Sequence, residues 1–121
     1  MGKILIIDDE PAIQGLLKLQ LEKAGHEVLI AADGAEGLAN AKKNNPDLIF
    51  LDVMIPKMDG WQVCREIKKS SQTPIVMLTT RTQKIEEMRG WEVGADDYVG
   101  KPWSPEKLKE ILDRFLKPAN A

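Results

Sequence analysis

The sequence contains few of the residues that build disulfide frameworks or membrane spans. Its 121 residues include a single cysteine, and aromatic residues make up only 5% of the chain. Cys64 alone cannot form an intramolecular disulfide, which suits a reducing compartment. No apolar run approaches the roughly 20 residues that a transmembrane helix needs, and the short run before Asp8 does not resemble a signal peptide. We therefore expect a cytoplasmic protein that does not act at a membrane.

A large excess of charge is also missing. The 17 basic and 19 acidic residues give a formal net charge of −2, which is no general reason to expect direct binding to nucleic acid. A hydrophobic content of 43% and a charged content of 30% are those of a folded globular chain. The length suits one domain with a real core but not two. We place this domain at residues 1–117 and interpret residues 118–121 as a tail or the stub of a linker.

Short apolar runs alternate with segments of helical periodicity. The runs lie at residues 3–7, 28–30, 48–51, 75–78 and 98–100. Helices are predicted from about residue 11 to 24, 33 to 43, 59 to 69, 82 to 92 and 104 to 116. Five βα units of this kind predict an α/β fold, in which right-handed crossovers place helices on both faces of a doubly wound, five-stranded parallel sheet.

Four of the five predicted strands are followed directly by a polar residue that can bind a ligand or take part in catalysis. Asp8 and Asp9 follow the first strand, Asp52 the third, Thr79 the fourth and Lys101 the fifth. Because the carboxyl ends of parallel strands meet at one edge of the sheet, where open α/β folds bind ligands, we expect these side chains to converge. Carboxylates, a hydroxyl and an ammonium group gathered there suit a divalent cation and a phosphoryl group.

The chemistry of this set favours phosphoryl transfer. Placing Asp8 or Asp9 near Asp52 without a cation is costly, and Mg²⁺ prefers such oxygen ligands. Lys101 supplies a positive charge, and Thr79 can donate a hydrogen bond to a phosphoryl oxygen. Asp52 is the best candidate nucleophile because it follows a predicted central strand, and carboxylates do form aspartyl-phosphate intermediates.

Four segments carry a highly specific pattern because they occur in this order and at this spacing. They are residues 4–10 (ILIIDDE), 46–60 (PDLIFLDVMIPKMDG), 74–79 (PIVMLT) and 94–102 (GADDYVGKP). With them the chain resembles, throughout residues 3–117, the response-regulator receiver domain of two-component signalling. The resemblance implies a flavodoxin-like fold, similar to that of chemotaxis regulators, with the strand order 2-1-3-4-5.

The resemblance also implies a role for each acidic residue. Asp52 would accept a phosphoryl group from a phosphohistidine on a sensor histidine kinase or phosphotransfer protein. Asp8 or Asp9, Asp52 and the backbone carbonyl of Met54 would hold Mg²⁺. The protein would then be a signalling switch that catalyses only its own phosphorylation and dephosphorylation, and not an enzyme that turns over a free substrate.

The remaining motif residues would form the switch. Thr79 and Lys101 would bind phosphoryl oxygens, and the Lys101–Pro102 peptide bond would be cis. Movement of Thr79 and Tyr98 would reshape the surface of the fourth helix, fifth strand and fifth helix for a partner or a missing output domain. Dimerisation on phosphorylation through the last two helices is a further family expectation.

Three other interpretations use the same residues. A haloacid-dehalogenase-like phosphatase needs an acid two residues after its nucleophile. Met54 occupies that place after Asp52, whereas Glu10 occupies it after Asp8. The chain also lacks room for a cap domain. A flavodoxin-like cofactor binder needs a phosphate loop after the first strand, where Asp8, Asp9 and Glu10 would repel phosphate. The complete acceptor set argues against a degenerate receiver that is never phosphorylated.

Overall fold

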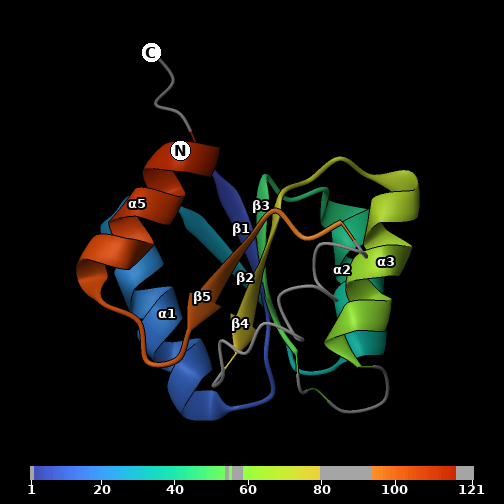
Figure 1. Ribbon diagram of the computed structural model, residues 1–121, viewed down its shortest axis with the longest axis horizontal. Coiled ribbons are helices and arrows are strands. Elements are labelled where there is room, and N and C mark those ends of the chain that lie inside the picture. The colour runs from blue at the N-terminus through green and yellow to red at the C-terminus, as the bar shows by residue number, and fades with distance from the viewer. Residues whose placement is uncertain (1, 54, 56–58, 80–93, 117–121) are drawn as a thin grey trace.

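The computed structural model describes residues 2–53, 55, 59–79 and 94–116, which form a layered α/β domain (Figure 1). The elements in chain order are β1 (Lys3–Ile7), α1 (Pro11–Lys23), β2 (Glu27–Ala31), α2 (Gly34–Asn44), β3 (Leu48–Asp52), α3 (Gly60–Ser70), β4 (Ile75–Thr79), β5 (Asp97–Gly100) and α5 (Pro105–Phe115). The helix predicted over residues 82–92 and the tail at 118–121 lie outside the described residues. No helix among the described residues has the length and apolarity to cross a membrane.

The five strands pair in parallel in the order β2-β1-β3-β4-β5, which confirms the predicted fold and strand order. Figure 1 shows α1 and α5 on one face of the sheet and α2 and α3 on the other. All residues of β3 and β4 are buried. The carboxyl ends of these two central strands are therefore held by close-packed neighbours on both faces.

Side-chain caps begin three of the described helices. The Asp33 side chain accepts a hydrogen bond from the backbone N–H three residues on, and Asp59 and Ser104 accept the equivalent bond at α3 and α5. Such bonds satisfy N–H groups that a helix leaves without an internal partner. The helices predicted to begin at about residues 33, 59 and 104 therefore do begin there. At α1 the N-cap is Glu10, whose side chain makes no capping bond.

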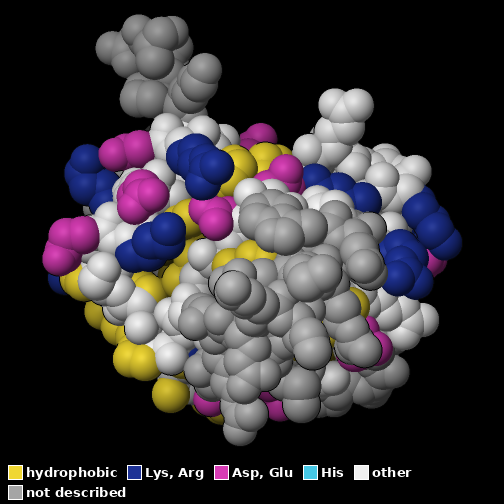
Figure 2. All heavy atoms as spheres, viewed as in Figure 1, with side chains coloured by type: hydrophobic (Ala, Val, Ile, Leu, Met, Phe, Trp, Pro, Cys, Tyr) yellow, Lys and Arg dark blue, Asp and Glu magenta, His cyan; other side chains and the backbone are white. Residues whose placement is uncertain are grey.

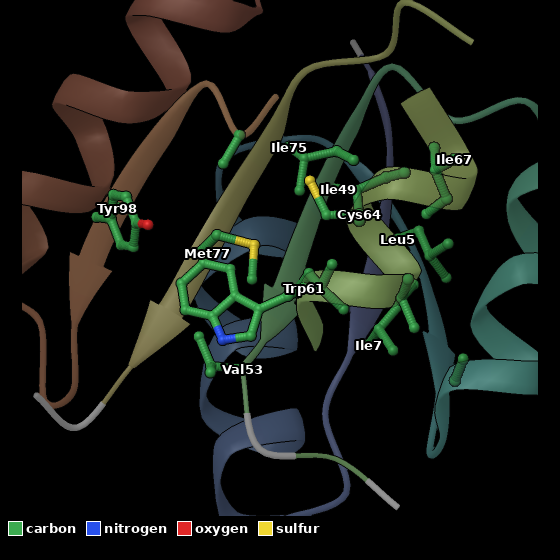
Figure 3. Close-up of a cluster of buried hydrophobic side chains, with 14 residues drawn as sticks. Leu5, Ile7, Ile49, Val53, Trp61, Cys64, Ile67, Ile75, Met77 and Tyr98 are labelled. Atoms are coloured by element: carbon green, nitrogen blue, oxygen red, sulfur yellow. The ribbon is translucent and has the colours of Figure 1, made fainter. Parts of the chain in front are cut away.

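Two apolar clusters enclose the sheet. The cluster beneath α1 and α5 includes Leu17, Phe50 and Ile111. Figure 3 shows the cluster beneath α2 and α3, in which the Trp61 indole lies against Met77. Cys64 is buried in this second cluster, and burial raises the pKa of its thiol to about 12. Cys64 is therefore a protonated core residue that acts through packing.

Gly15 is expected to be a stabilising site for substitution. It lies in the middle of α1, and nothing lies within 4 Å of the position that a Cβ atom would take. Gly15→Ala should raise the free energy of unfolding by up to about 1 kcal/mol, because glycine loses more backbone entropy in a helix than alanine. Urea unfolding followed by circular dichroism measures this change. An unchanged or lower midpoint would contradict the open surroundings of Gly15.

Candidate functional site

The predicted polar residues converge at the carboxyl edge of the sheet. Asp8 follows β1, Asp52 ends β3, Thr79 ends β4 and Lys101 follows β5. Asp8, Asp52 and Thr79 are only 0%, 4% and 4% exposed, although all three are polar. Burial of such groups is costly without hydrogen-bond or charge partners. Their common location therefore indicates a preorganised functional site and not a chance grouping of polar surface residues.

Lys101 is the centre of the arrangement. Its Nζ lies 2.8 Å from Asp8 Oδ2, 3.1 Å from Asp52 Oδ2 and 3.2 Å from Glu10 Oε1. The side chain is only 6% exposed. Burial by itself would lower the pKa of Lys101, but the hydrogen bond to Asp8 and the charge and hydrogen bond of Asp52 outweigh it and raise the pKa. Lys101 is therefore a permanent cation at neutral pH.

The loop between β1 and α1 is held from several sides. The Asp8 N–H donates to the carbonyl of Ala31 at 3.1 Å, and Asp8 Oδ1 accepts from the N–H of Glu10 at 2.9 Å. Gln14, one turn into α1, donates its side-chain amide to the Asp8 carbonyl at 2.5 Å. These bonds orient the Asp8 carboxylate toward Lys101. The preorganised loop needs little rearrangement to present its acidic groups.

The residues present fit Mg²⁺. Asp8, Glu10 and Asp52, here called the carboxylate cluster, can each place an oxygen within 4.8 Å of the others. The cluster offers only hard oxygen ligands, and it sets three carboxylates against the ammonium of Lys101. A divalent cation would balance the two remaining negative charges, and Mg²⁺ is a divalent cation that prefers such ligands.

The carboxylate cluster shares Asp8 and Asp52 with the predicted ligand set and adds Glu10. Asp9 is exposed and is not among the three clustered residues, whereas Glu10 is. Our assignment did not include Glu10 as a metal residue. The signal was available, because side chains two residues apart leave an extended chain on the same side, and this relates Asp8 to Glu10. The role predicted for Asp9 stays a prediction, and Met54 lies outside the described residues.

Gly60 supports the acceptor strand from behind. Its N–H donates to the carbonyl of Val53 at 2.9 Å, while the N–H of Val53 donates to the carbonyl of Leu78 in β4 at 3.1 Å. A Cβ atom at position 60 would collide with the carbonyl oxygen of Asp52 and would lie 2.7 Å from Val53 Cα. The start of α3 thus packs directly against the backbone that carries Asp52.

The predicted switch residues lie on neighbouring strands. Thr79 pairs with Gly100 across β4 and β5, and its carbonyl accepts from the N–H of Lys101 at 2.7 Å. Tyr98 is 9% exposed, and its ring centroid is 6.3 Å from that of Trp61 (Figure 3). The Lys101–Pro102 peptide bond is cis, in agreement with the resemblance. Thr79 is therefore placed beside Lys101, with Tyr98 in the core behind it.

One protein family matches most of the chain. The model of the response regulator receiver domain matches residues 4–113. Among curated relatives, the probable transcriptional regulator ycf27 of Porphyridium aerugineum is 47% identical over 115 residues, covering 95% of this chain and 48% of the relative. The regulatory protein PhoP of Bacillus subtilis, named for alkaline phosphatase synthesis, is 43% identical over 116 residues, covering 95% of this chain and 48% of its own.

Solved structures give the same result. A two-component response regulator from Clostridium difficile superimposes with a TM-score of 0.93 at 31% identity and covers 100% of both chains. The chemotaxis protein CheY4 of Vibrio cholerae gives a TM-score of 0.90 at 40% identity, covering 96% of this chain and 99% of its own. The receiver domain of the Pseudomonas aeruginosa sensor kinase PA1611, with magnesium in its active site cleft, gives 0.89 at 28% identity, covering 97% and 98%.

Proposed function

This chain belongs to the family of response regulator receiver domains of two-component signalling, and from that premise we propose that Asp52 is its phosphoacceptor. The donor is the phosphohistidine of a sensor histidine kinase or phosphotransfer protein. The observation that carries the proposal is the contact of the buried Asp52 carboxylate with Lys101, at the end of a central strand. The comparisons lend no support to the phosphatase alternative.

The residues around Asp52 have distinct roles in this phosphoryl transfer. Asp52 Oδ attacks phosphorus, and the bond from phosphorus to the imidazole nitrogen breaks, so that the leaving imidazole keeps the electron pair. The Lys101 ammonium then binds one phosphoryl oxygen, and the Thr79 hydroxyl donates a hydrogen bond to another. Asp8 and Asp52, with Asp9 and the Met54 carbonyl as further predicted ligands, would hold Mg²⁺. When bound, Mg²⁺ neutralises negative charge on the phosphoryl oxygens.

The output of the switch is a partner protein or an attached domain. Receiver domains of regulators are signalling switches, and this chain spans about half the length of the curated transcriptional regulators that it matches. We propose that phosphorylation reshapes the surface of β5, α5 and the predicted fourth helix, and that dimerisation through this surface is one form of output. Thr79 and Tyr98 relay the change. A cytoplasmic location is proposed because of the family.

The surface over α5 suits a protein partner better than nucleic acid. Figure 2 shows acidic and basic side chains interspersed at the upper left, where Figure 1 places α5. On α5, Lys107 pairs with Glu110 at 3.7 Å and Lys109 pairs with Asp113 at 3.0 Å. Alternating signs of this kind give direction to a protein contact but offer no uniform attraction to phosphates.

Intact mass spectrometry tests the proposal directly. The chain is incubated with a small phosphodonor, with and without Mg²⁺, beside an Asp52→Asn variant. We expect a single phosphoryl adduct that requires Mg²⁺ and is absent from the variant, because the amide is neither a nucleophile nor an anionic ligand. If the small donor gives no adduct, a phosphohistidine donor is used next. A folded chain that neither donor modifies at Asp52 would refute the proposal, as would turnover of a phosphate monoester.

A further inference from the structure

Glu10 is the exposed member of an otherwise buried arrangement. The Glu10 side chain is 56% exposed, whereas those of Lys101, Asp8 and Asp52 are 6%, 0% and 6% exposed. Its carboxylate oxygen nevertheless lies 3.2 Å from Lys101 Nζ. Glu10 therefore forms the solvent side of the carboxylate cluster, with an oxygen within 4.8 Å of one on Asp52.

Glu10 accepts the third hydrogen bond that the Lys101 ammonium group can donate. A lysine ammonium has three N–H donors, and Lys101 has three carboxylate acceptors, at 2.8 Å, 3.1 Å and 3.2 Å. The bond to Glu10 is the longest and reaches the most solvated partner. It is therefore the easiest to release and to re-form when Lys101 changes partners.

The position of Glu10 also places a negative charge where the donor must arrive. Phosphorus has to come within bonding distance of an Asp52 oxygen, and oxygens of Glu10 and Asp52 lie within 4.8 Å of one another. Any group delivered to Asp52 thus passes within a few ångströms of the Glu10 carboxylate. Its repulsion grows in proportion to the negative charge that the donor carries.

We propose that Glu10 is a specificity-determining residue, whose carboxylate makes the chain discriminate between phosphodonors by their charge. Phosphodonors with less negative charge, such as monoanions, are favoured over dianionic phosphodonors. The inference rests on the proposed function of Asp52. The transfer itself is unchanged: an Asp52–phosphorus bond forms as the bond from phosphorus to the leaving group breaks, and the leaving group departs with the electron pair.

The test compares two small donors of different charge. Acetyl phosphate is a dianion near neutral pH and phosphoramidate is a monoanion. Rates of adduct formation on Asp52 are measured by intact mass at saturating Mg²⁺, for the unmodified chain and for Glu10→Gln. Glu22→Gln, an exposed position on α1, is the matched control because it removes the same charge elsewhere.

We expect Glu10→Gln to accelerate transfer from acetyl phosphate about three-fold. Phosphoramidate carries half the charge and so feels half the repulsion energy, and its transfer should be accelerated only by the square root of that factor, about 1.7-fold. Both factors should approach one at about 1 M salt, where the screening length is only about 3 Å. Glu22→Gln should leave both rates unchanged. In a calorimetric titration without donor, Glu10→Gln should also weaken Mg²⁺ binding a few-fold, because one anionic neighbour is lost.

Several results would overturn the inference. Equal factors for the two donors, factors that do not respond to salt, or slower transfer from both donors at saturating Mg²⁺ would each show that Glu10 does not act through donor charge. In those cases the adduct still forms and the proposed function stands. Absence of any Asp52 adduct in the unmodified chain with both small donors and with phosphohistidine would refute the proposed function, and this inference with it.

Discussion

Lys101→Met is expected to lower the free energy of unfolding by about 3–5 kcal/mol and to abolish phosphoryl transfer to Asp52. Methionine keeps most of the apolar stem but leaves Asp8 and Asp52 as buried carboxylates without their cation. Removing one partner of a buried ion pair costs this much because an uncompensated charge stays behind. Urea unfolding in the absence of Mg²⁺ measures the loss, and intact mass measures the transfer.

The control for this prediction is Lys18→Met, which removes the same charge from an exposed position on α1. It should change stability by no more than about 0.5 kcal/mol. Mg²⁺ should stabilise Lys101→Met more than the unmodified chain, because a bound cation takes over the missing positive charge. A variant as stable as the unmodified chain without Mg²⁺ would show that Lys101 does not compensate the two carboxylates.

The stability that Lys101 contributes also has a defined pH range. Because its pKa is raised in the folded chain, the contribution is fully present below the unfolded value of about 10.4 and is lost only as the pH rises through the folded value. The difference between the unmodified chain and Lys101→Met should therefore be constant from about pH 6 to about pH 9. A loss of the difference within this range would contradict the raised pKa.

Gly60→Ala is expected to cost about 2–4 kcal/mol and to slow phosphorylation of Asp52 at least about ten-fold. The new Cβ atom would meet only backbone atoms, namely the carbonyl of Asp52, Val53 Cα at 2.7 Å and the Val53 carbonyl at 3.0 Å. Backbone at the end of a buried strand cannot move aside as a flexible side chain can, so α3 or the end of β3 must shift. A shift of β3 displaces the Asp52 carboxylate from Lys101, and small displacements of reacting groups are costly.

Two other glycines provide graded controls for Gly60. Gly15→Ala has open space around its new Cβ atom and should stabilise the chain. Gly37→Ala would place its Cβ 2.6 Å, 2.9 Å and 3.0 Å from Cδ1, Cγ1 and Cγ2 of the buried Ile7 side chain, and because a side chain can repack more readily than backbone can shift, we expect a smaller loss than at Gly60. Urea unfolding measures the free energy of unfolding of the three variants and so ranks them. Equal stability of Gly60→Ala and Gly15→Ala would show that α3 does not press on the Asp52 backbone.

Local physical chemistry explains why the fold could be predicted. The apolar runs alternate with helical segments, and Asp33, Asp59 and Ser104 mark helix starts by a bond to an N–H only three residues away. These effects act over a single turn or strand, so the order of residues encodes them directly. The convergence of Asp8, Asp52, Thr79 and Lys101 followed from one additional rule, that parallel strands share a carboxyl edge.

The composition of the carboxylate cluster was only partly encoded locally, since the two-residue spacing relates Asp8 to Glu10 but does not bring either residue to Lys101. Lys101 bonds to Asp8 across 93 positions in the chain, and which acid of the β1–α1 loop joins them depends on how α1 holds that loop. Glu10, which we had not assigned to the site, lies beside Lys101, and the metal-binding role predicted for Asp9 stays a prediction. Periodicity and capping describe neighbours along the chain, whereas this selection arises from Coulomb attraction and burial between groups that meet only when the sheet is assembled.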